Sequence, residues 1–204
     1  MIRILRYGKD TNEDIFTRFT PQYGVEDVVA EILDTVRREG DRALFAYNEK
    51  FDGAVTEELR VSEAEIAEAM ELTEPGLLEV IRQAAANIRK FHEKQVRSGF
   101  IINDVSGVLM GQKVTPIEKV GLYVPGGTAP YPSTVLMDAI PAKIAGCSEL
   151  VMVTPPGRDG RVNPAILAAA YIAGVDKIFK VGGAQAVAAL AFGTESIPRV
   201  EKIV

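Results

Sequence analysis

Two glycine-containing loops carry the residues of this sequence that are best suited to hold a ligand. The first, Tyr-Val-Pro-Gly-Gly-Thr-Ala-Pro at 123–130, follows a short apolar run and precedes a stretch that is expected to be helical. Glycines let backbone N–H groups approach a ligand closely, and the start of a helix favours an anion. The glycine spacing differs from Gly-x-Gly-x-x-Gly, so the standard dinucleotide fingerprint is absent. A cofactor-binding loop and a plain turn between strand and helix both fit this segment.

The second loop is Gly-Gly-Ala-Gln at 182–185, and it also follows an expected strand. The amide of Gln185 can donate and accept hydrogen bonds together, which suits a nicotinamide, a ribose or a phosphate oxygen. The phenol of Tyr123 offers a flat apolar face and one polar tip, which suits a ribose or an adenine. Because parallel strands deliver their loops to one edge of a sheet, we expect Tyr123 and Gln185 to share that edge. The alternative for Gln185 is a helix residue that faces water.

The single histidine and the single cysteine are expected to be structural. His92 stands late in a long expected helix, beside the apolar Phe91. Cys147 follows Gly146 at a helix end, and no base or cationic group is evident beside it, which favours a small buried apolar role. One histidine and one cysteine offer no closely spaced set of metal ligands and no Ser-His-Asp arrangement. We therefore predict neither a metal ligand nor a catalytic residue in this chain.

Composition narrows the classes of protein that fit. The chain has 204 residues, 47% of them apolar, and a net charge of −5, which is typical of a soluble globular protein and poorly suited to nucleic acid. The longest uncharged run, 120–137, contains several prolines and glycines, so we expect no membrane helix there. No signal peptide is evident, and a lone cysteine excludes an internal disulfide, which fits a reducing cytoplasm.

Periodicity predicts that the first half of the chain is helical. Apolar residues over 25–36 recur on one stripe, and Gly40 is expected to end this helix in the left-handed conformation. Asp41 is placed to cap a second helix that runs to Phe51.

Two further helices follow in the first half. Ser62 and Glu65 have capping-box spacing, and Pro75 suits the first turn of a longer helix. The apolar face expected on that longer helix comprises Leu77, Leu78, Ile81, Ala84, Ala85, Ile88 and Phe91. The stretch 97–106 is the best candidate for a boundary.

Strands and helices alternate in the second half. The expected strands are 108–114, 119–124, 149–154, 177–181 and 200–204, and the expected helices are 133–146, 163–173 and 184–192. This alternation implies a parallel sheet, with Ser133 and Thr134 as candidate caps of its first helix. We predict an α/β fold in which a mainly helical region, 1–106, precedes an incomplete Rossmann-like parallel sheet at 107–204, with helices on both faces. A chain that ends in a strand is also expected to be part of a longer protein.

Several runs of residues match the signature of a known family. They are Val-Gly-Leu-Tyr-Val-Pro-Gly-Gly-Thr-Ala-Pro (120–130), Ser-Thr-Val-Leu-Met (133–137), Pro-Ala (141–142), Ile-Ala-Gly-Cys (144–147), Val-Gly-Gly-Ala-Gln-Ala (181–186) and Ala-Leu-Ala-Phe-Gly-Thr (189–194). Gly-Asp (40–41), Lys-Phe-Asp (50–52) and Phe-His (91–92) also stand at the expected places. The sequence, from about residue 22 to its last residue, resembles the amino-terminal half of histidinol dehydrogenases.

The resemblance implies a zinc-dependent cytoplasmic homodimer in histidine biosynthesis. Such an enzyme oxidises L-histidinol to L-histidine through L-histidinal, with two NAD. The residues that match the family's NAD contacts are Tyr123 and Gln185, and Pro125 and Gly126 belong to the same expected cofactor site.

Other residues of the family's site have no counterpart in these 204 residues. They are an asparagine in a Gly-Pro-Gly-Asn run, the Gln, His, Asp and His zinc ligands, and a Glu-His catalytic pair. We therefore expect the isolated chain to be inactive, because oxidation of an alcohol to an acid needs a base and a polarising metal. A free-standing module that binds a nucleotide or a partner remains an alternative. A weaker alternative is a relative of aldehyde dehydrogenases with Cys147 as nucleophile, which its helix-end position argues against.

Overall fold

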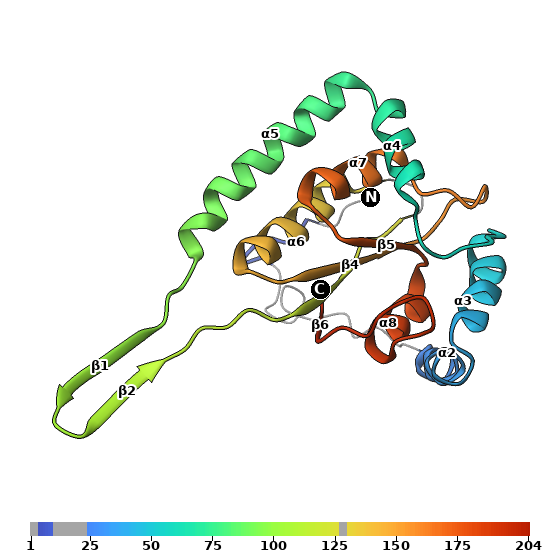
Figure 1. Ribbon diagram of the computed structural model, residues 1–204. Coiled ribbons are helices and arrows are strands. Elements are labelled where there is room, and N and C mark those ends of the chain that lie inside the picture. The colour runs from blue at the N-terminus through green and yellow to red at the C-terminus, as the bar shows by residue number, and fades with distance from the viewer. Residues whose placement is uncertain (1–3, 10–23, 127–129) are drawn as a thin grey trace.

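A four-stranded parallel sheet organises the computed structural model, which describes residues 4–9, 24–126 and 130–204 (Figure 1). The strands lie in the order β5-β4-β3-β6. Their bounds are Lys119–Tyr123 for β3, Glu149–Thr154 for β4, Lys177–Lys180 for β5 and Lys202–Ile203 for β6. In chain order, β4 and β5 are added on one side of β3, and β6 is then added on its other side. The order therefore reverses between β3 and β6, which is where open α/β sheets bind ligands, at the carboxyl edge.

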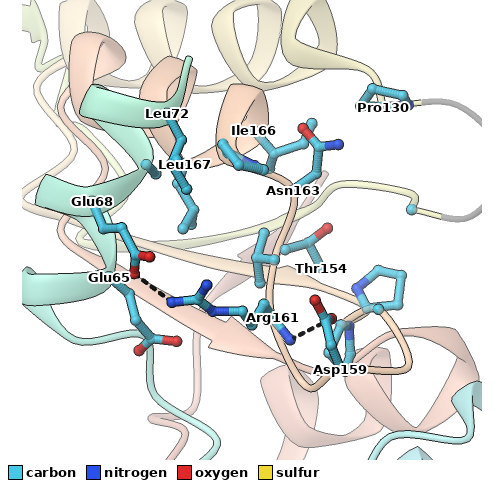
Figure 2. Close-up of a pocket in the computed structure, with 17 residues that line it drawn as sticks. Glu65, Glu68, Leu72, Pro130, Thr154, Asp159, Arg161, Asn163, Ile166 and Leu167 are labelled. Atoms are coloured by element: carbon cyan, nitrogen blue, oxygen red, sulfur yellow. Dashed lines mark hydrogen bonds and ion pairs between the residues drawn. The ribbon is translucent and has the colours of Figure 1, made fainter.

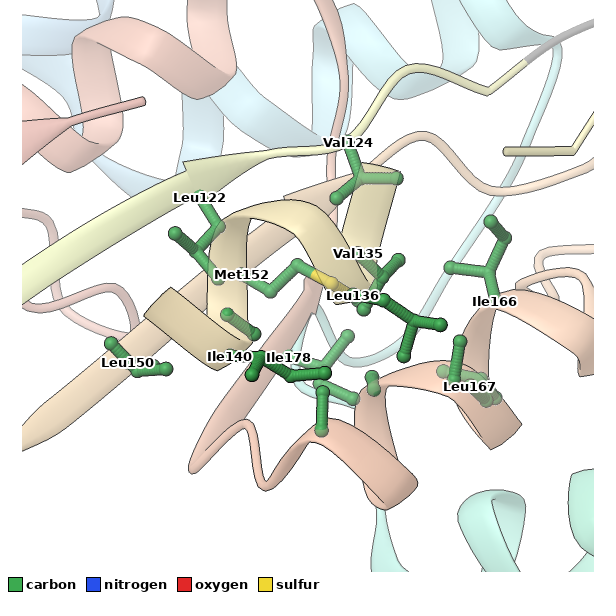
Figure 3. Packing of buried hydrophobic residues seen from close by; sticks show 14 of the residues in the cluster. Leu122, Val124, Val135, Leu136, Ile140, Leu150, Met152, Ile166, Leu167 and Ile178 are labelled. Carbon is green, nitrogen blue, oxygen red and sulfur yellow. The ribbon is translucent and has the colours of Figure 1, made fainter. Parts of the chain in front are cut away.

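Helices cover both faces of the sheet, as expected. One face carries α4 (Glu63–Leu72), α5 (Pro75–His92), α6 (Pro132–Ala145) and α7 (Pro164–Ala173). Figure 3 shows part of its core, where Leu122, Leu136 and Met152 pack with no more than 2% of their surface exposed. The other face carries α2 (Glu26–Glu39), α3 (Asp41–Tyr47), the π-helix η1 (Asn48–Asp52) and α8 (Gly183–Phe192).

The helices of the first half do not form a core of their own. Each of the two hydrophobic clusters joins helix residues from before position 100 to strand residues from after it. Leu44 and Phe179 belong to one cluster, and Ile81 and Leu150 belong to the other. The division at 106/107 falls in a hairpin turn and stays a prediction.

A short segment before α4 extends the sheet edge in a way that the sequence pattern did not predict. Arg60 forms an antiparallel bridge with Phe179 of β5. Lys180 N donates to Leu59 O at 2.7 Å, and Val61 N donates to Ile178 O at 2.9 Å. Because this segment runs antiparallel to β5, the residues just before it lie beyond the carboxyl end of β5.

The expected strand 108–114 was wrongly assigned to the parallel sheet. It forms β2 (Val108–Gln112), which among the described strands pairs only with β1 (Phe100–Val105), in a separate antiparallel sheet. The candidate boundary 97–106 thus contains a strand. The hairpin formed by β1 and β2 projects from the body, together with the segments of chain that lead to and from it (Figure 1). Its exposed apolar side chains are Phe100, Ile101, Ile102, Val108, Leu109 and Met110.

Some helix starts agree with the sequence and others do not. Ser62 and Glu65 form the expected capping box, and Pro75 is the first residue of α5. Asp41 does not cap α3; it is the first helical residue, and its carboxylate instead accepts a hydrogen bond from Ser196 N at 3.3 Å. The N-cap of α6 is Tyr131 with Pro132 following, so neither Ser133 nor Thr134 caps that helix.

Gly40 ends α2 with a positive φ of 55°, but its ψ of −133° lies outside the left-handed helical region. A side chain at this position would overlap the carboxylate of Glu195, which accepts a hydrogen bond from Asp41 N at 2.8 Å. The positive φ favours glycine here, and a side chain would also displace the Glu195 carboxylate from this hydrogen bond.

The predicted apolar face of α5 is only partly buried. Leu78, Ile81 and Ala85 are buried, whereas Phe91 is 64% exposed. The reason is that the last turns of α5 extend past the sheet toward the hairpin (Figure 1). Within the described ranges, no helix is both long enough and apolar enough to cross a membrane.

Candidate functional site

The two predicted loops meet at the carboxyl edge of the sheet. Tyr123 is the last residue of β3, and its half-buried ring packs against the hydrophobic cluster on the α8 face. Its hydroxyl oxygen accepts a hydrogen bond from Gly183 N at 3.2 Å. Because β4 lies between β3 and β5, the phenol spans the end of β4 and links the loops on either side of it. The expectation of a shared edge for Tyr123 and the Gln185 loop is confirmed.

Gly183 begins α8 in a conformation that favours glycine, with φ +67°. The N-cap residue, Gly182, has no side chain to accept a hydrogen bond. The hydroxyl of Tyr123 takes that role, since it accepts the N–H of the first helical residue. The neighbouring N–H groups of the first turn and the positive end of the helix dipole favour an anionic ligand at this edge.

Gln185 does not face water, so that alternative is wrong. It is 2% exposed, and its amide folds back over Gly183, where an added Cβ would lie 2.7 Å from Gln185 Oε1. Among the described residues, no hydrogen bond is found for its side chain. Its amide atoms are also not among the fully buried polar atoms that lack a partner, so water or a ligand can reach them.

Pro125 and Gly126 lie in the loop after β3, as expected, and residues 127–129 of that loop lie outside the described residues. The structure adds Pro155, which follows β4 between the two glycine loops. A Cβ on Gly126 would lie 2.5 Å from Pro155 Cγ, and a Cβ on Gly182 would lie 2.6 Å from Pro155 Cβ. The sequence signal for this residue is the run Pro-Pro-Gly at 155–157, directly after a buried strand.

A second feature of this edge is a cleft of about 490 Å³ between α4 and the start of α7 (Figure 2). It shares Gly126 and Pro155 with the first site but lies toward the other face of the sheet. Figure 2 shows Arg161 reaching Glu68, with which it forms an ion pair. No sequence pattern predicts this cleft, because its walls come from segments almost 100 residues apart.

Charge in this cleft is largely paired. Lys180, at the end of β5, forms an ion pair with Glu65 at 2.6 Å, and only 11% of the Lys180 side chain is exposed. Burial acts to raise the pKa of Glu65, but hydrogen bonds from Lys180 and Ser62 outweigh it and lower the pKa.

Asp52 in η1 is a further carboxylate whose pKa is raised by burial. One of its carboxylate oxygens has no hydrogen-bond partner in the described structure.

The two residues predicted to be structural stand apart from the loops. Cys147 is buried in the core of the α6 face, which agrees with a small apolar role. His92 ends α5, and its Nδ1 lies 2.6 Å from Gln95 Oε1, a local contact. The described part of the chain holds no group of three or more His, Cys, Asp or Glu side chains that could bind a metal ion.

Comparisons with known proteins agree with one another. The family model described as histidinol dehydrogenase matches residues 18–204. A histidinol dehydrogenase of Clostridium acetobutylicum is 46% identical over 209 residues, covering 100% of this chain and 48% of that protein. One from Listeria monocytogenes serotype 4b is 49% identical over 204 residues, covering 100% and 46%. The chain therefore spans about half the length of the curated relatives it matches.

A solved structure supports the same assignment. The crystal structure of histidinol dehydrogenase from Elizabethkingia anophelis matches with a TM-score of 0.87 and 41% sequence identity. The match covers 91% of this chain and 43% of that one. The fold described above is thus that of part of the larger protein.

Proposed function

The chain belongs to the histidinol dehydrogenase family, and on that premise we propose that it forms the nucleotide-binding part of an enzyme that oxidises L-histidinol to L-histidine. The reaction would pass through L-histidinal and use two NAD. The enzyme would serve histidine biosynthesis, in keeping with the names of the relatives, and would be cytoplasmic, in keeping with the lone cysteine.

One observation carries the proposal for NAD: Tyr123 Oη accepts from Gly183 N, two residues before the buried amide of Gln185. This contact gathers an aromatic ring, a helix start and a side-chain amide at the edge where α/β sheets bind nucleotides. We assign NAD contacts to Tyr123 and Gln185, with Pro125 and Gly126 bringing backbone close to the ligand.

The residues fit NAD by their chemistry. Bound NAD would accept the hydride that leaves the substrate carbon. The first turn of α8 would stabilise negative charge on a phosphate, because its N–H groups point out of the helix. The Gln185 amide, which makes no hydrogen bond within the described residues, would orient the nucleotide by donating to and accepting from ligand atoms.

The residues do not fit zinc. The sequence has one histidine and one cysteine, and the described side chains form no cluster of metal ligands. We propose that zinc is held by residues outside these 204, and that the chain alone neither oxidises histidinol nor holds NAD tightly.

We further propose that the enzyme is a homodimer, and the hairpin supports this. Ile101 and Leu109 are 75% and 70% exposed on an arm that projects from the body (Figure 1). Apolar surface of this kind is usually covered by a partner. Light scattering after gel filtration should give a dimer mass, which Leu109→Asp should reduce and Tyr171→Asp, on exposed α7 surface, should not. A monomer for the unchanged protein would contradict this part of the proposal.

The test of function uses a chimera in which this chain replaces the matching half of the Listeria monocytogenes relative. With histidinol, NAD and zinc, we expect NADH formation. Gln185→Ala should reduce it, and Tyr171→Ala should leave it unchanged. A folded chimera that forms no NADH would contradict the proposed function. If the 204-residue chain alone binds NAD tightly without turnover, the alternative of a free-standing binding module would gain instead.

A further inference from the structure

Pro155 occupies the space between the two glycine loops, although nothing in its chemistry marks it as a ligand-binding residue. Its ring follows β4, the strand that lies between β3 and β5. The three atoms nearest to a Cβ added at Gly126 all belong to Pro155, and so do the three nearest to a Cβ added at Gly182. The shortest distances, 2.5 Å and 2.6 Å, are too short for any side chain.

Backbone conformation does not explain these two glycines. Gly182 has φ −122° and ψ −171°, an extended conformation open to any residue. Gly126 also lies outside the left-handed region, unlike Gly183. Close approach to Pro155 is thus the reason that both positions lack a side chain. The proline ring is rigid, so it fixes how far apart the two loops can lie.

The spacing matters because the loops carry the two halves of the nucleotide site. The loop after β3 begins at Tyr123, and the loop after β5 holds Gly183 and Gln185. The hydrogen bond from Gly183 N to Tyr123 Oη is long, at 3.2 Å, so its strength depends on small changes in the spacing of the loops.

We propose that Pro155 is a positioning residue: its ring, clamped between Gly126 and Gly182, sets the distance between the Tyr123 and Gln185 loops and thereby the geometry of the nucleotide site. The proposal rests on the proposed function for its consequence in binding. Its structural core, the spacing of the loops, can be measured without a nucleotide.

The first measurement follows the Gly183 amide resonance in ¹H–¹⁵N spectra of the 204-residue chain. Tyr123→Phe removes the acceptor and identifies the shift that marks a broken bond. Pro155→Ala should move the Gly183 resonance in the opposite direction, because the Cγ and Cδ atoms that hold the loops apart are gone and the hydrogen bond can shorten. Pro156→Ala removes the next proline of the same loop and should leave Gly183 in place. An unmoved Gly183 resonance in folded Pro155→Ala would overturn the proposal.

A double-mutant cycle tests the contact itself. Gly126→Ala adds a methyl group where the Pro155 ring lies, so it should lower the urea midpoint of the unchanged chain. In the Pro155→Ala background the loss should be smaller, because the clashing ring atoms are absent. Equal losses in the two backgrounds would overturn the contact as the reason for the glycine.

Titration with NAD then separates the two proposals. In the chimera, Pro155→Ala should weaken NAD binding about fivefold, the effect of one displaced contact, and Pro156→Ala should not. A folded Pro155→Ala chimera that binds NAD as tightly as the unchanged chimera would overturn the positioning role. If the unchanged chimera does not bind NAD, the proposed function fails, while the Gly183 resonance and the cycle still decide the role of Pro155.

Discussion

Tyr123→Phe removes one hydroxyl and leaves the ring in place, so it isolates the contact that joins the two loops. The lost hydrogen bond is neutral and 3.2 Å long, near the upper limit for N–H···O. Its donor, Gly183, is exposed, so water can replace the acceptor. A neutral hydrogen bond contributes about 0.5–1.5 kcal/mol net, and these two conditions place the expected loss in free energy of unfolding at roughly 0.5–1 kcal/mol.

Urea unfolding followed by far-ultraviolet circular dichroism is the suitable assay, because the chain has no tryptophan and tyrosine emission would change with the mutation. Tyr123→Ala provides a comparison: it also removes half-buried ring surface and should cost roughly 1–2 kcal/mol more. A loss above about 2 kcal/mol for Tyr123→Phe would refute the reasoning, since one solvent-accessible hydrogen bond cannot supply it. So would an unchanged rate of hydrogen exchange at the Gly183 amide.

The remaining predictions concern charge, the thiol and the metal. Lys180→Met should lower stability at neutral pH by about 1–2 kcal/mol, because it leaves a half-buried Glu65 carboxylate unpaired. Since the folded pKa of Glu65 is lowered, its stabilisation is present above the unfolded pKa near 4.5 and is lost as pH falls through the folded value, so the gap between variant and unchanged chain should close in acid urea titrations. Cys147→Ser should cost about 1 kcal/mol in denaturation, and rapid labelling of the native thiol would argue against a structural role. Elemental analysis after zinc loading and dialysis should find well below one zinc per chain; a stoichiometric ion would reveal a missed site. The chain alone, given histidinol, NAD and zinc, should form no more NADH than its Tyr123→Ala variant.

The elements predicted most closely are those that local sequence determines. The Ser62–Glu65 capping box and Pro75 at the start of α5 involve residues a few positions apart, so the sequence displays the whole interaction. The strand at Glu149–Thr154 is a buried apolar run with clear ends, and it was predicted to the residue.

Errors arose where a distant segment decides the outcome. Asp41 is a residue type that often caps helices, but its carboxylate accepts a hydrogen bond from Ser196, which lies 155 positions away in the sequence. Residues 108–112 have the apolar content of a buried strand, yet their partner is the adjacent β1 and all five are exposed.

The candidate site also has features that the sequence predicts and features that depend on distant segments. The meeting of Tyr123 with the second loop follows from the shared edge of parallel strands, a rule that needs only strand order. The burial of Gln185 depends on how its side chain folds over Gly183, and the role of Pro155 depends on two glycines that approach it from either side. Such contacts have no period or spacing in the sequence.

The measurement that tests the central claim most directly is the dissociation constant of NAD for the chimera, by calorimetry, with and without Gln185→Ala. Loss of the hydrogen bonds of one amide should weaken binding by roughly 1–2 kcal/mol, which corresponds to about 5- to 30-fold. Tyr123→Ala should have an effect of similar size, and Tyr171→Ala none. Equal NAD affinity for the unchanged chimera and a folded Gln185→Ala variant would contradict a nucleotide site at this edge.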